Sequence, residues 1–108
     1  MKEEERNFKL TTLEAKILLA MVIVGMPTRV QPVLNELHSE TGRYYAYTSI
    51  ATTMVRMQNK GILSSKRSGT AFEYTSTNSV NYWIGRALRE VMNQFFDGDL
   101  QKLKAHVA

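Results

Sequence analysis

The sequence predicts a mainly α-helical fold with one small antiparallel β-hairpin. Three observations lead to this prediction. The 108 residues, 44% hydrophobic and 22% charged, suit one folded domain. Apolar residues recur at three- and four-residue steps in four separate segments. A single stretch, between the third and fourth of these, combines a turn signal with strand-like alternation.

The first expected helix starts at a capping box, because Thr11 and Glu14 have the spacing at which each side chain bonds the other's backbone. It runs to about Val24, where Gly25 and Pro27 stop it. Residues 17–24 form the longest apolar run, far short of the roughly 20 residues that span a bilayer, so we expect a cytoplasmic protein without a membrane partner. The expected inward face is Leu13, Ile17, Leu18, Met21 and Val24.

The second expected helix lies within residues 28–42. Proline fits best at the first helical position, so the regular helix is expected to start near Gln31 or Pro32. Gly42 supplies the left-handed stop. The expected stripe is Leu34, Leu37 and Thr41.

The third expected helix, residues 46–61, carries the strongest functional signal. Ile50, Met54 and Met57 take its inward face. Short hydroxyls and one long cation take the opposite face, where small side chains allow close approach to a major groove and arginine can read guanine or hold a phosphate. This polar face consists of Thr48, Thr52, Arg56 and Asn59, with Ser49 beside it.

Residues 62–74 follow as a predicted two-stranded hairpin, with its turn at Ser68-Gly69 and with Lys66 and Arg67 at its tip. Three helices and a basic-tipped hairpin in this order predict a winged helix-turn-helix. In that fold the third helix enters the major groove and the wing touches the DNA backbone.

The charge distribution supports a polyanionic partner. The net charge is +4, and residues 28–70 carry all of it, with six basic against two acidic side chains. Clustered lysine and arginine bind phosphates by releasing condensed counterions. The side chains expected to contact double-stranded DNA are Arg43, Tyr47, Thr48, Ser49, Thr52, Arg56, Lys60, Lys66 and Arg67.

The last long helix is expected over residues 79–96, followed by a short one that Asp99 caps. Its wide apolar stripe with large aromatics favours a homodimer interface, although part of it could cover the winged domain instead. The chain thus divides into a flexible tail (1–9), a winged helix-turn-helix domain (10–76) and a C-terminal helical dimerisation region (77–108). The expected interface consists of Val80, Trp83, Ile84, Ala87, Leu88, Val91, Met92, Phe95 and Phe96.

Composition argues against an enzyme. The chain has no cysteine, which removes thiolate catalysis and thiolate-bound zinc, and only two His and two Asp. We expect no catalytic site, no metal and no cofactor.

Several segments resemble the BlaI/MecI/CopY family of winged-helix repressors. The similarity covers residues 10–14, 46–50 with Arg56, 60–63 and 69–74, and continues through Gly98, Leu103, Ala105 and His106. It implies a bacterial-type homodimeric repressor on a palindromic operator, with Thr48, Ser49, Thr52 and Arg56 facing DNA and Lys66 and Arg67 serving the wing. The missing cysteines exclude the copper-sensing mode. Residues 105–107 lack the Asn-Phe bond that is cut in penicillinase-type members, so the inducer, a small molecule or a protein, is unassigned.

Two alternatives remain open at the level of sequence. Residues 37–42 and the long C-terminal helix are also similar to PadR-like regulators, in which Trp83 would stack on a planar ligand. A winged helix that serves only as a protein-interaction module is the other alternative, and it requires a polar face on residues 46–61 without affinity for nucleic acid.

Overall fold

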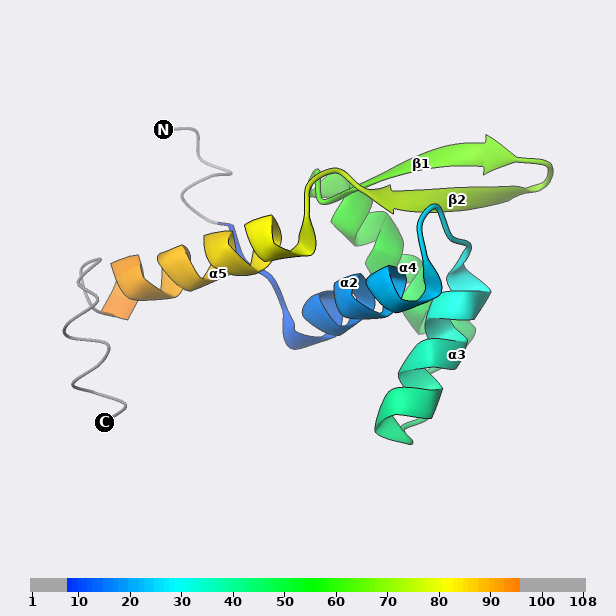
Figure 1. Cartoon of the computed structure of the whole chain (residues 1–108), viewed down its shortest axis with the longest axis horizontal. Helices are drawn as coiled ribbons and strands as arrows, with labels where there is room; N and C mark the ends of the chain where they lie inside the picture. Colours follow the sequence, from blue (N-terminus) through cyan, green and yellow to red (C-terminus); the bar gives the residue numbers. More distant parts are fainter. Residues whose placement is uncertain (1–7, 96–108) are drawn as a thin grey trace. The chain divides into compact units, whose positions relative to one another are not determined.

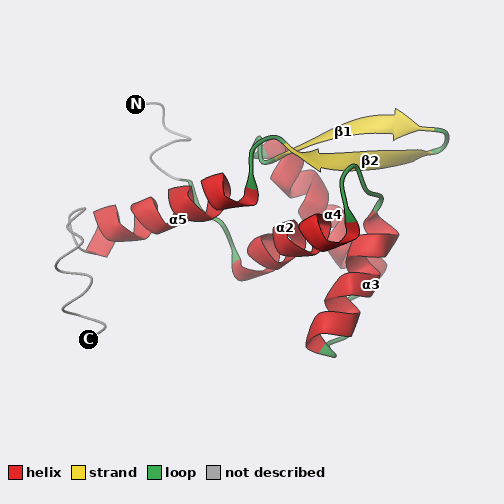
Figure 2. Cartoon of the chain, in the orientation of Figure 1, coloured by secondary structure: helices red, strands yellow, loops and turns green. Residues whose placement is uncertain are grey.

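A computed structural model describes residues 8–95. Within this range the helices and strands follow the predicted order (Figure 1): α2 (Thr12–Val24), α3 (Val30–Thr41), α4 (Tyr47–Asn59), β1 (Leu63–Ser68), β2 (Ala71–Ser76) and α5 (Val80–Phe95). These residues form two compact units, one of residues 11–80 and one of residues 8–10 with 81–95. The predicted fold class is confirmed. The described residues are mainly α-helical, and their two strands form one antiparallel hairpin (Figure 2).

Helix α2 begins at the predicted capping box. The Thr11 hydroxyl accepts a hydrogen bond from the Glu14 amide at 3.1 Å, and the Glu14 carboxylate accepts one from the Thr11 amide at 2.8 Å. Gly25 ends the helix with φ 91°. Of the predicted inward face, Ile17, Leu18 and Met21 are fully buried, and Leu13 and Val24 are half-buried.

Helix α3 differs from its prediction in its start and its buried face. It starts at Val30, so Pro32 is the third helical residue; proline is tolerated there because the first-turn amides have no partner within the helix. The buried side chains are Val30, Val33 and Leu37. Thr41, expected on the inward stripe, is exposed, and Gly42 ends the helix in the predicted left-handed conformation.

Helix α4 completes the core of the first unit. Its predicted inward residues Ile50, Met54 and Met57 are all fully buried. The helix packs against α2, α3 and β1, so its inward face is fixed by three neighbours. This packing determines which side chains of α4 remain outside.

The hairpin is longer than predicted, and its turn is one residue further on. Ser68 pairs with Ala71, which leaves Gly69 and Thr70 as the loop, with Gly69 at φ 64°. The turn is the end of the hairpin that lies away from α4 (Figure 2). Two backbone hydrogen bonds between Thr28 and Tyr74, at 3.0 and 2.7 Å, fasten the segment before α3 to β2.

The second unit is organised around an aromatic stack. Phe8 lies 5.7 Å from Trp83 between ring centroids, and the Arg86 guanidinium lies 4.3 Å from the Phe8 centroid. Phe8 and Trp83 are only 5% and 3% exposed. Phe8, which the sequence assigned to a flexible tail, is therefore a packed residue of this unit. Phe96 and the short helix predicted after Asp99 lie outside the described residues.

Candidate nucleic-acid interface

The outer face of α4 is polar and accessible. Thr48, Ser49, Thr52 and Arg56 are all exposed, as the spacing of the inward residues predicts. Thr48 and Arg56 are eight residues apart, about 12 Å along the axis at 1.5 Å per residue. The major groove of B-DNA is also about 12 Å wide, so this row has the dimension of one groove.

The start of α4 adds positive potential. Its first turn contains no acidic residue, so the positive end of the helix dipole is not neutralised by a carboxylate within that turn. Tyr47 is half exposed, and the exposed Arg43 just upstream has its guanidinium 5.5 Å from the Tyr45 ring centroid. A cation and a phenol thus flank the end of the helix at which phosphates are favoured.

The two basic residues of the wing are not at its tip. Lys66 and Arg67 are consecutive, exposed residues of β1, and the turn follows at Gly69. Consecutive side chains of a strand point to opposite faces. Lys66 is paired in register with Glu73 and Arg67 with Phe72, so the two cations start from opposite faces of the hairpin.

Lys60 differs from the other expected DNA contacts because it forms an ion pair inside the fold. Its ammonium nitrogen lies 2.8 Å from Glu14 Oε1, and the Glu14 side chain is fully buried. The pair joins the start of α2 to the residue that ends α4. The charge of Lys60 therefore neutralises a buried carboxylate.

Arg29 is a cation of this region that the sequence interpretation did not single out. It is exposed, and its guanidinium approaches the Ser68 carbonyl oxygen of the wing at 3.5 Å. The backbone pairing of the adjacent Thr28 with Tyr74 holds Arg29 beside the wing.

The Tyr74 ring, in the strand residue that pairs with Thr28, is neutral at physiological pH. Burial, and then the neighbouring Tyr47, raise the pKa of the Tyr74 phenol above its ordinary 10.0.

Residues 10–108 match the family model of the penicillinase repressor. The chain belongs to the penicillinase repressor family. A search of curated proteins found none that matches it. Family membership confirms the resemblance found in the sequence. It also assigns the chain to the class of DNA-binding transcriptional repressors. This favours the repressor interpretation over the PadR-like alternative, over a pure interaction module and over an enzyme.

The remaining sequence-predicted site of this penicillinase repressor family member is on α5. Ile84, Leu88 and Val91 are 39%, 51% and 43% exposed and follow four- and three-residue steps, which places them on one side of the helix. Val80, Ala87 and Met92 are half-buried. Trp83 is covered by its own chain and does not belong to the exposed stripe. The Phe95 side chain and Phe96 are beyond the described part.

Among residues 8–95, no helix combines the length and apolar character that crossing a bilayer requires. Over the same range, no three His, Cys, Asp or Glu side chains gather as metal ligands would.

Proposed function

We propose that this chain acts in the cytoplasm as a homodimeric, sequence-specific repressor that inserts α4 into the major groove of a palindromic operator. The observation that carries the proposal is the row of Thr48, Thr52 and Arg56 on the outer face of a helix whose opposite face is fully buried. A helix held in this way presents small hydroxyls and one guanidinium to base edges at fixed positions.

The other exposed cations are suited to the DNA backbone. Arg43 precedes α4, Lys66 and Arg67 belong to β1 of the wing, and Arg29 reaches the wing through the Ser68 carbonyl. The phenol of Tyr47, at the first position of α4, can add a hydrogen bond to the backbone. Contacts of this kind set the register of the protein on the duplex and supply salt-dependent affinity, but they carry no sequence information. Lys60 has a structural role in this proposal, because its charge is engaged with Glu14.

The exposed stripe of α5 supports dimerisation. Ile84, Leu88 and Val91 would pack against the same residues of a second chain, since a two-fold interface uses one patch twice. Two symmetry-related α4 helices would then read half-sites about one DNA turn apart.

The direct test is an electrophoretic shift with DNA from upstream of the chain's own gene, followed by footprinting. We expect binding that weakens steeply with salt and a footprint with two-fold symmetry. A scrambled duplex of equal length and composition is the control. Equal affinity for both duplexes would contradict sequence-specific repression, and absence of binding at low ionic strength would contradict a DNA-binding role altogether.

Replacing Leu88 by glutamate is expected to convert dimers to monomers. The side chain is 51% exposed, so the fold tolerates the change, whereas two carboxylates at the centre of an apolar two-fold contact oppose association. Sedimentation equilibrium should show a dissociation constant raised at least about tenfold, which corresponds to about 1.4 kcal/mol. The exposed Asn93, on a different side of α5, provides the control substitution Asn93→Glu. An unchanged dimer in Leu88→Glu would place the interface elsewhere.

A further inference from the structure

Helix α2 is apolar on both its inner and its outer side. Ile17, Leu18 and Met21 form the buried side, yet Leu19, Val22 and Ile23 are 51%, 54% and 62% exposed. Helices that are apolar all round are normally covered all round, and exposed apolar patches mark binding surfaces. DNA does not account for these side chains, because they offer no group that can pair with a phosphate or a base edge.

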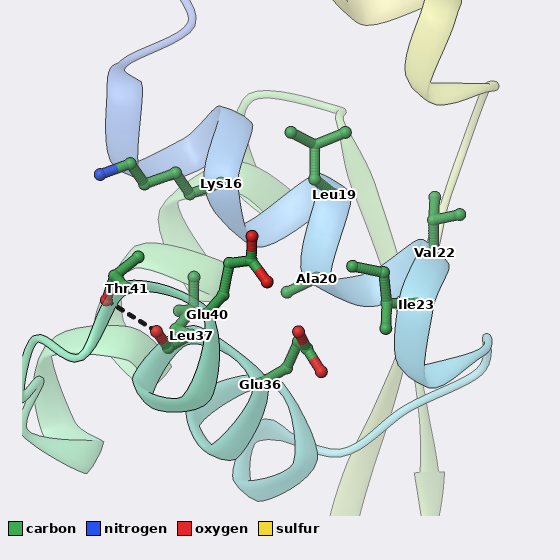
Figure 3. A pocket seen from close by; sticks show the side chains of 9 residues that line it. All are labelled: Lys16, Leu19, Ala20, Val22, Ile23, Glu36, Leu37, Glu40 and Thr41. Carbon is green, nitrogen blue, oxygen red and sulfur yellow. Dashed lines mark hydrogen bonds between the residues drawn. The ribbon is translucent and has the colours of Figure 1, made fainter.

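The exposed side of α2 forms one wall of a groove against α3 (Figure 3). The α2–α3 groove has a volume of about 510 Å³. Leu19, Ala20 and Ile23 supply its apolar wall, and Glu36 and Glu40 line it from α3. No residue of α4 or of the hairpin lines it, so an occupant of the groove and a DNA duplex contact different side chains.

The groove is acidic as well as apolar. Glu36 and Glu40 are one helical turn apart, and both side chains reach from α3 toward α2 (Figure 3). Within residues 8–95, neither carboxylate has a hydrogen-bond or ion-pair partner. They are also the two acidic residues of the otherwise basic segment 28–70. Lys16 also lines the groove from α2, but its ammonium points away from the two carboxylates (Figure 3). The lining therefore carries a net charge of −1, and the part that Glu36 and Glu40 form is complementary to a cation.

We propose that the α2–α3 groove binds a basic amphipathic helix of a partner protein. Lys16 to Ile23 spans about 10 Å of the α2 axis, which matches two turns of a docked helix. In this binding mode the apolar stripe of the partner lies in the groove and its lysines or arginines pair with Glu36 and Glu40. A small ligand fits less well, because small-molecule sites enclose most of the ligand surface, whereas the groove residues Leu19, Val22 and Ile23 are each more than half exposed.

The test uses the full-length chain and a fluorescein-labelled probe of 14 residues, made of leucine at helical a and d positions and lysine elsewhere. A second probe has glutamate in place of every lysine. We expect saturable binding of the lysine probe by fluorescence anisotropy and none of the glutamate probe. The double variant Glu36→Lys/Glu40→Lys should bind the lysine probe at least about tenfold more weakly, and it should gain binding of the glutamate probe. Unfolding cannot produce that exchange of preference.

A matched pair of apolar substitutions locates the site. Ile23→Gln should lower the affinity for the lysine probe severalfold, and Leu88→Gln on α5 should leave this affinity unchanged. The opposite pattern would place the peptide on α5 and overturn the proposal. Dissociation of a dimer by Ile23→Gln would make the groove a contact between copies, which also overturns it. Binding to upstream DNA, measured in parallel, should persist in every groove variant, so failure of this proposal is separable from failure of the repressor proposal.

Discussion

Arg56→Ala is expected to weaken binding to the specific operator by about 1–3 kcal/mol, a loss of about 5- to 150-fold, while binding to unrelated DNA changes little. Arg56 is the one basic residue in the sequence of α4, and its side chain is exposed on the outer face of the helix. Met54 and Met57, its buried neighbours, hold that part of the helix against the core. A guanidinium presented from a fixed helix discriminates bases because it pairs with two acceptors on guanine at once.

The wing supplies the comparison for this prediction. Lys66→Ala and Arg67→Ala should lower affinity similarly for operator and scrambled DNA, and a residue that holds one phosphate should reduce the salt slope by about one. Since the two side chains point to opposite faces of β1, we expect one variant to show most of the effect. Anisotropy titrations at several salt concentrations measure both quantities. A sequence-blind loss in Arg56→Ala would show that Arg56 holds phosphate only.

Local patterns predicted much of the fold and the chemistry of the outer face of α4. The capping box of Thr11 and Glu14 involves residues three apart, and the stripe of Ile50, Met54 and Met57 repeats within one helix. Interactions at such separations are set by backbone geometry that every helix shares. Burying the stripe leaves only one side for Thr48 and Arg56, so their exposure follows from the same pattern.

Contacts between distant segments could not be predicted in this way. The ion pair of Glu14 and Lys60 joins residues 46 apart, and the stack of Phe8 on Trp83 joins residues still further apart in the sequence. No periodicity encodes such pairs. The hairpin shows a related limit, because placing its turn at Ser68-Gly69 instead of Gly69-Thr70 shifts the register and changes which residues lie at the tip.

Lys60→Met is expected to lower the free energy of unfolding by about 2–4 kcal/mol, because it leaves the carboxylate of Glu14 buried without its counter-ion. The Glu14 Oε2 atom already has no hydrogen-bond partner among the described residues, so burial of the charge is offset at Oε1, by the Lys60 ammonium and the Thr11 amide. Urea denaturation followed by circular dichroism at 222 nm measures the loss. Gln58→Met, at an exposed position of α4, is the control and should change stability by less than about 0.5 kcal/mol.

Glu14→Gln distinguishes the ion pair from the cap. The amide oxygen of glutamine can still accept a hydrogen bond from the Thr11 amide at the start of α2, and the Lys60 side chain is 27% exposed, so its ammonium can turn to water. We therefore expect Glu14→Gln to cost less than Lys60→Met, and Glu14→Gln/Lys60→Met to recover part of the loss, because no buried charge remains. A Lys60→Met protein with normal stability but reduced affinity for all DNA would instead assign Lys60 to a phosphate contact and contradict its structural role.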